Sequence, residues 1–148
     1  MGLIEELHGQ RIILDTAPII YFIEEHETYR NIVRPVFVEI DSGNIEAITS
    51  TITLLEVLVH PLRTGNETLA EKYREILLSS AGLITFEISH EISEMASRLR
   101  AKYSIRTPDA IQIAAGIQHG AAYFLTNDPD LRKVSEIKIL ILGDYLPN

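Results

Sequence analysis

The sequence contains no cysteine, and none of its apolar runs approaches the roughly 18 residues that a membrane-spanning helix needs. Without cysteine the chain has no disulfides, no thiolate zinc site and no cysteine nucleophile. Its first residues, Met-Gly-Leu-Ile-Glu-Glu, lack the basic region and the apolar core of a signal peptide. We therefore expect a soluble, cytoplasmic protein with no membrane segment.

Basic residues are also scarce, with 13 Lys and Arg against 21 Asp and Glu and a net charge of −8. Such a chain is not an obvious nucleic-acid binder, because Lys and Arg make the contacts to phosphates. The distribution of charge matters more than its sum, however. Four basic residues fall close together, at Arg98, Arg100, Lys102 and Arg106. This basic cluster is either a solvated helix face or a surface for a nucleic-acid backbone.

The length and the apolar content favour one globular domain over residues 1–148. A chain of 148 residues with 46% hydrophobic residues can bury a sizeable core without disulfides or structural metal sites. There is no internal repeat, low-complexity stretch or linker. Short apolar runs predict strands at 11–14, 45–49, 83–88, 122–125 and 138–142.

Helical periodicity and capping residues predict the remaining elements. The expected helices cover 18–23, 32–40, 51–62, 67–78 and 90–103, followed by one that opens at 107–109 and ends before 120. In the helix over 51–62, four leucines share one face and Glu56 lies beside them. Strands that alternate with helices predict an α/β fold, a three-layer αβα sandwich around a mostly parallel sheet of about five strands.

Four acidic residues lie where such folds form sites, at the carboxyl ends of strands and near helix N-termini. They are Asp15, Glu56, Asp109 and Asp128. Each also has a local explanation: a helix cap for Asp15, a pair with His60 for Glu56, a helix-dipole partner for Asp109 and an Asx-turn for Asp128. Carboxylates gathered at one sheet edge repel one another unless a cation joins them. Oxygen ligands suit Mg²⁺ or Mn²⁺, so we expect these four acids to hold such an ion.

The same segments resemble the motifs of PIN domains. The resemblance is carried by Asp15-Thr16 after the first strand, by the Thr-x-x-x-Leu-Glu segment that ends at Glu56, by 108–115 (Pro-Asp-Ala-Ile-Gln-Ile-Ala-Ala) and by 125–128 (Leu-Thr-Asn-Asp). It covers nearly the whole chain. The compact length is most similar to that of the VapC-type toxins of toxin–antitoxin pairs.

This resemblance implies an endoribonuclease that uses Mg²⁺ or Mn²⁺. Asp15, Glu56, Asp109 and Asp128 would then be both catalytic residues and metal ligands, with Asp130 replacing or supporting Asp128. Thr16, Thr126 and Asn127 would orient a ligand or a water molecule. The basic cluster would hold the RNA backbone. The resemblance also implies a homodimer and a cognate antitoxin.

Two other functions remain open from the sequence. One is a metal-dependent phosphatase with Asp15 as a covalent nucleophile. Such sites commonly place a second Asp two residues on, where this chain has Ala17. The other is a PIN-like module that binds RNA or a protein without cleaving it.

Overall fold

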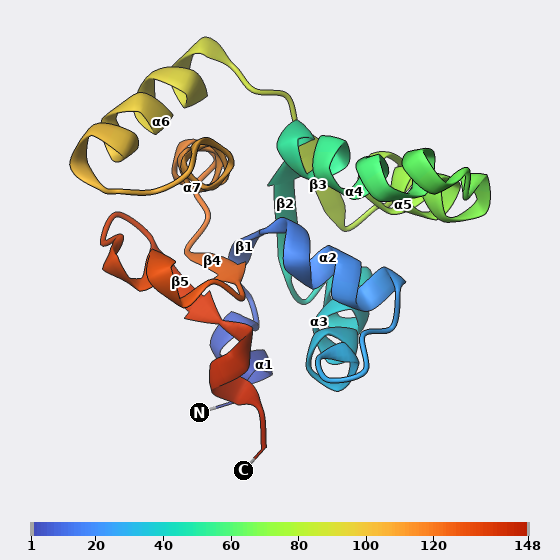
Figure 1. Ribbon diagram of the computed structural model, residues 1–148. Helices are drawn as coiled ribbons and strands as arrows, with labels where there is room; N and C mark the ends of the chain where they lie inside the picture. The colour runs from blue at the N-terminus through green and yellow to red at the C-terminus, as the bar shows by residue number, and fades with distance from the viewer. Residues whose placement is uncertain (1, 148) are drawn as a thin grey trace.

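The computed structural model describes residues 2–147, and its centre is one sheet of five parallel strands in the order β3-β2-β1-β4-β5 (Figure 1). The strands are β1 (Arg11–Leu14), β2 (Glu46–Ser50), β3 (Leu83–Phe86), β4 (Tyr123–Thr126) and β5 (Lys138–Ile141). The helices are α1 (Leu3–Leu7), α2 (Thr16–Ile23), α3 (Arg30–Asp41), α4 (Thr51–Thr64), α5 (Glu67–Ser79), α6 (His90–Lys102) and α7 (Thr107–Gln118). Two 3-10 turns follow the last strands, η1 (Pro129–Lys133) and η2 (Leu142–Tyr145).

Alternate residues of β1 face two separate cores, which makes the molecule three-layered. Ile12 and Leu14 pack among apolar residues of α1, α2, α3 and α5. Ile13 packs on the other face, among apolar residues of α6 and α7. This alternation is the period of two that a strand imposes on its side chains. The structure confirms the predicted three-layer α/β fold and its central parallel sheet.

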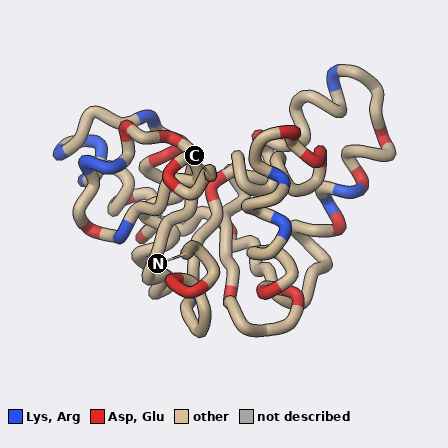
Figure 2. Tube along the Cα trace, turned by 90° about the horizontal axis from the view of Figure 1, so that it is seen from below, with Lys and Arg blue, Asp and Glu red and all other residues tan. Residues whose placement is uncertain are grey.

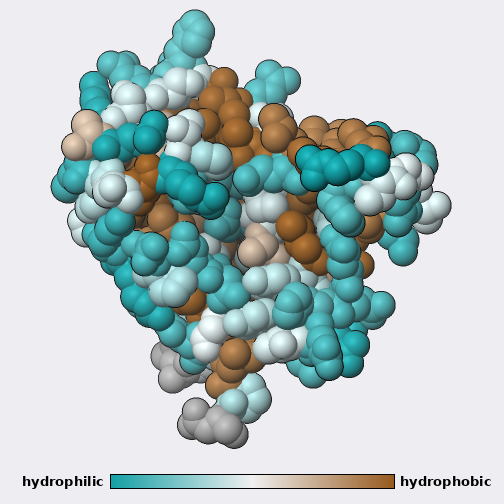
Figure 3. Space-filling view, in the orientation of Figure 1, coloured by the Kyte–Doolittle hydropathy of each residue, from teal (hydrophilic) through white to brown (hydrophobic). Residues whose placement is uncertain are grey.

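Helix α4 differs from its prediction in the face that it buries. Its core-facing residues are Thr53, Val57 and Pro61, whereas Leu55 is 61% exposed and Leu62 is 52% exposed. Leu54 and Leu58 are partly buried and pack against the core, so only half of the predicted leucine face is exposed. Figure 3 shows an apolar surface over α4 and α5. The buried Thr53 places its hydroxyl 2.8 Å from that of Thr49 on β2, and Glu56 follows it about one turn later in α4.

Several boundaries also differ from the sequence prediction. Helix α2 begins at Thr16, two residues before the expected start, because Asp15 caps it. Helix α4 runs past Pro61 to Thr64 and ends at Gly65, whose φ of 72° is the left-handed value that glycine adopts most readily. Strand β3 ends at Phe86 rather than 88. In the described part of the chain, no helix is long and apolar enough to cross a membrane.

Candidate active site

Asp15 is the first residue after β1 and the N-cap of α2. Its Oδ1 accepts a hydrogen bond from the backbone N–H of Thr16 at 2.8 Å. Its Oδ2 accepts one from the hydroxyl of Thr126, at the end of β4, at 2.7 Å. Because β1 and β4 are neighbours in the sheet, residues 111 positions apart in the chain meet here.

Burial makes the Asp15 carboxyl hard to ionise. Desolvation raises its pKa from 3.8 to about 6, although the hydrogen bonds from Thr126 and Thr16 act in the opposite direction. The negative charges of Asp109 and Glu56 add smaller increases, which the value of about 6 already includes. A nearby positive charge would therefore stabilise the ionised form of the Asp15 carboxyl.

The Glu56 side chain hydrogen-bonds with Thr16 on α2 and not with a residue of its own helix. Its Oε1 accepts a hydrogen bond from the Thr16 hydroxyl at 2.6 Å. Among the residues that the structure describes, its side-chain partner is thus Thr16 on α2, not His60 on α4. The local alternative, a pair between Glu56 and His60, is thus not formed, because α4 packs against α2 and Glu56 reaches Thr16 there.

Asp109 lies in the first turn of α7 and is nearly buried, with its side chain 6% exposed. Arg106 donates to both of its carboxylate oxygens, from Nε at 3.1 Å and from Nη2 at 3.4 Å. The guanidinium itself stays 73% exposed. The pKa of Arg106 is raised, chiefly by its hydrogen bonds to Asp109.

Asp128 follows β4 and caps η1. Its Oδ1 accepts a hydrogen bond from the backbone N–H of Asp130 at 3.0 Å, which is the Asx-turn that the sequence suggested. Its own N–H donates to the hydroxyl of Thr126 at 3.2 Å. Asp130 is exposed and is not among the residues that line the cavity that the other acids share.

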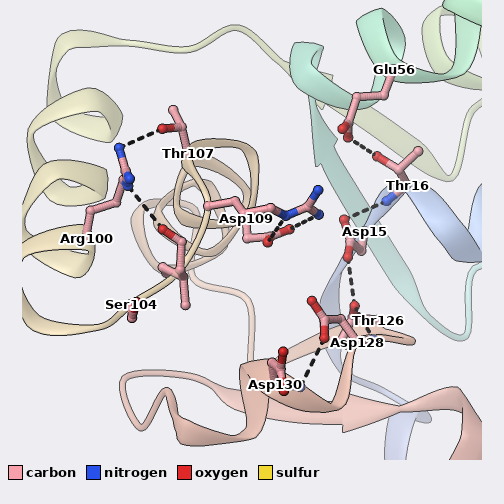
Figure 4. A network of polar contacts seen from close by, with 12 residues as sticks. Asp15, Thr16, Glu56, Arg100, Ser104, Thr107, Asp109, Thr126, Asp128 and Asp130 are labelled. Carbon is pink, nitrogen blue, oxygen red and sulfur yellow. Dashed lines mark hydrogen bonds and ion pairs between the residues drawn. The ribbon is translucent and has the colours of Figure 1, made fainter.

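Four acids from four separate elements line one hollow of about 280 Å³. Figure 4 shows Asp15, Glu56, Asp109 and Asp128 arranged around it, with Thr16 and Thr126 between them. Ala17, Ile20, Tyr21, Asn127 and Arg106 complete its wall. We call this cavity the acidic hollow. It lies at the carboxyl edge of the sheet, where a parallel α/β fold places its sites.

The acids line the hollow without closing into a metal cage. Within residues 2–147, no three Asp, Glu or His side chains stand close enough to hold an ion as they are. Glu56 and Asp109 are instead engaged by Thr16 and Arg106. The donor set still suits a hard divalent cation, since it consists of oxygen atoms and includes a buried carboxylate whose pKa is raised by desolvation.

Asn127, the other polar residue expected at the site, joins three parts of the chain. Its side-chain amide donates to the hydroxyl of Tyr21 at 3.1 Å, and its oxygen accepts from the backbone N–H of Gly143 at 3.0 Å. Both ends of this side chain are therefore engaged by protein groups. Asn127 fixes the wall of the hollow.

Only one member of the basic cluster reaches the acidic hollow. Arg106 lines it, whereas Arg98 and Lys102 line a separate cavity beside α6. Arg100 supports the connection into α7 through the Ile105 carbonyl and the Thr107 hydroxyl. Across the molecule, Lys and Arg are interspersed with Asp and Glu rather than gathered on one face (Figure 2).

A buried polar network behind the hollow is a feature that the sequence did not predict. The Ser50 hydroxyl donates to the side-chain oxygen of Gln112 at 2.7 Å, and the Gln112 amide donates to Thr53. Thr53 lies 3.5 Å from the Thr16 hydroxyl, which in turn holds Glu56. Gln112 stands inside the apolar run Ala-Ile-Gln-Ile-Ala, and that interruption was the available signal in the sequence.

A parallel sheet that gathers acids from the ends of β1 and β4 and from helices α4 and α7 at one edge defines an α/β protein with a carboxylate-lined site. The model of the PIN domain family matches residues 12–137, and the chain belongs to this family. No curated protein matches the sequence.

Similar solved structures come from bacterial toxin–antitoxin systems. VapBC2 from Rickettsia felis, bound to a DNA fragment from its promoter, is 17% identical with a TM-score of 0.70, covering 88% of this chain and 98% of that one. VapC20 from Mycobacterium tuberculosis, a toxin that cleaves the sarcin–ricin loop, is 17% identical with a TM-score of 0.68, covering 86% and 98%. A toxin–antitoxin complex from Klebsiella pneumoniae is 20% identical with a TM-score of 0.67, covering 88% and 97%. At these identities the likeness establishes the fold.

Proposed function

We propose that this PIN-domain protein is a cytoplasmic, single-domain endoribonuclease that depends on Mg²⁺ or Mn²⁺. The observation that carries the proposal is the acidic hollow, where Asp15, Glu56, Asp109 and Asp128 converge from four elements. The family membership and the sarcin–ricin loop cleavage described for the similar VapC20 support RNA as the substrate.

In this proposal the acids have different tasks. Asp15 and the buried Asp109 would hold the ion, and Asp128 would complete its ligands from the end of β4. When bound, such an ion supplies charge neutralisation at a phosphodiester and promotes water as a nucleophile. Glu56, oriented by the Thr16 hydroxyl, would accept the proton that the attacking water loses. Thr126 would keep Asp15 in place.

We also propose that the protein is the toxin of a toxin–antitoxin pair and acts as a homodimer. Support comes from its structural neighbours, which include toxins in complexes with their antitoxins. Co-expression with the product of an adjacent reading frame, followed by size-exclusion chromatography with light scattering, tests both the partner and the oligomeric state.

The activity is tested by incubating purified protein with labelled structured RNAs, including a sarcin–ricin-type stem–loop, in Mg²⁺ or Mn²⁺. We expect cleavage that EDTA abolishes and that Asp109→Asn lowers by about 10²-fold or more, the scale on which catalytic groups act. Asp130→Asn is the matched control, because it removes an exposed acid that does not line the hollow. Equal losses in both variants would contradict the site.

A second candidate is a PIN-like module that binds RNA without cleaving it. It is favoured by the ion pair that engages Asp109 and by the lack of a ready-made cage within residues 2–147. Calorimetry with Mn²⁺ separates the two functions. If the protein neither binds Mn²⁺ nor cleaves any RNA of the panel, the binding module becomes the better description.

A further inference from the structure

The acidic hollow already contains a positive charge that belongs to the protein. Among residues 2–147 that line it, Arg106 is the one Lys or Arg side chain. Its guanidinium contacts both oxygens of Asp109, at 3.1 Å and 3.4 Å. These are atoms that the proposed function assigns to a metal ion, so the guanidinium and the ion compete for the same carboxylate.

The two partners of this ion pair differ in how freely their side chains can move. The Asp109 side chain is 6% exposed and fixed on α7, whereas the Arg106 side chain is 73% exposed on a long flexible stem. Arg106 is the N-cap residue of α7, yet its side chain takes no part in capping the helix. The guanidinium can therefore leave Asp109 without disturbing the start of the helix.

We propose that Arg106 is a tethered counter-ion that occupies Asp109 in the metal-free protein, yields it to the divalent ion, and then binds a phosphate of the RNA backbone. The inference rests on the proposed function. A guanidinium is suited to this exchange, because the two N–H groups that grip a carboxylate fit a phosphate equally well. The ion thus performs two tasks, since it fills the hollow and releases the group that receives the substrate.

This exchange makes metal binding and RNA binding favour each other. An ion that frees Arg106 raises the affinity for RNA, and by thermodynamic reciprocity RNA raises the affinity for the ion by the same factor. The ion pair also means that Asp109 is not an unpaired carboxylate before the ion arrives. In an acidic protein with a net charge of −8, a released arginine at the site supplies a phosphate contact where it is needed.

The first test measures Mn²⁺ binding by calorimetry, without RNA, for the full-length protein and its variants. We expect Arg106→Gln to bind Mn²⁺ about tenfold more tightly, within the range of ordinary coupling effects, and Arg106→Lys to fall between it and the unchanged protein. Arg98→Gln is the charge-matched control, because Arg98 pairs with Glu94 beside a different cavity. Equal Mn²⁺ affinity for Arg106→Gln and Arg98→Gln would overturn the inference while leaving the metal site intact.

The second test measures binding of a fluorescein-labelled stem–loop RNA by anisotropy, with and without Mn²⁺, in a Glu56→Gln background that keeps the RNA whole. We expect Mn²⁺ to strengthen RNA binding by about tenfold when Arg106 is present and to have little effect in Arg106→Gln. The same Mn²⁺ enhancement in both proteins would overturn the role of Arg106. Absence of any Mn²⁺ binding would overturn the inference together with the proposed metal site.

Discussion

The buried Asp15 carboxyl lowers the stability of the fold when it is ionised. The residue is placed by two ordinary hydrogen bonds, yet its surroundings raise its pKa to about 6. An acid whose pKa is higher in the folded than in the unfolded chain stabilises the fold at low pH, and this stabilisation is lost as the pH rises through the folded value. A shift of about two pKa units corresponds to about 3 kcal/mol.

Replacing Asp15 by Asn removes this titration and keeps the shape of the side chain. In EDTA at pH 7 we expect Asp15→Asn to have a free energy of unfolding higher than that of the unchanged protein by up to about 3 kcal/mol. The variant then unfolds at a higher urea concentration. The difference should shrink steadily as the pH falls from above 6 to about 4, where the native carboxyl is already protonated. Urea denaturation at several pH values measures it. If the free energies of unfolding of the two proteins changed in parallel with pH, burial would not raise the pKa of Asp15.

The sequence was informative about single residues only where a local rule applied. Asp15 as a helix cap and Asp128 in an Asx-turn follow from short-range hydrogen bonding, and the structure has both. The partners Thr126 and Thr16 depend on contacts across the sheet and between helices, which no local pattern contains. The four acids could be picked out because strand ends and helix starts meet at one edge of a parallel sheet.

At the scale of elements, the order of strands and helices was predictable and the buried face of α4 was not. Periodicity identified each long helix because core-facing residues recur every three to four positions. In α4, Leu55 and Leu62 satisfied that pattern but are exposed, since the helix turns Thr53 and Val57 to the core. Leu54 and Leu58 are partly buried and pack against that core. Periodicity gives the faces of a helix; the rest of the fold decides which face is covered.

Helix α7 is placed against the sheet by a close approach at Gly116. A methyl group there would lie 2.6 Å from the Cγ2 atom of Ile13 on β1, closer than carbon atoms pack. We expect Gly116→Ala to destabilise the protein by about 1–3 kcal/mol, as overpacking does, even though alanine favours a helix. Gln118→Ala, on the exposed end of the same helix, is the control. Thermal unfolding measures both, and a more stable Gly116→Ala would show that α7 shifts freely.

At the scale of the whole molecule, the two cores share one sheet. Ile12 and Leu14 belong to one core and Ile13 to the other, so neither helical layer can leave without exposing β1. We therefore expect one cooperative unfolding transition for the whole chain. Scanning calorimetry tests this by comparing the measured enthalpy with the van't Hoff enthalpy. Two resolved transitions would indicate that the layers unfold separately.

The strand order has a consequence for how the protein comes into being. Strand β1 leaves the ribosome early, but its neighbour β4 follows more than a hundred residues later, and the Asp15–Thr126 hydrogen bond spans 111 positions. A nascent chain that has not yet reached β4 lacks the last wall of the hollow, including Asp128. Under the proposed function, a ribonuclease built in this order would stay incomplete while it is still attached to the ribosome. The order of the strands would thus delay completion of the site until β4 and β5 have joined the sheet.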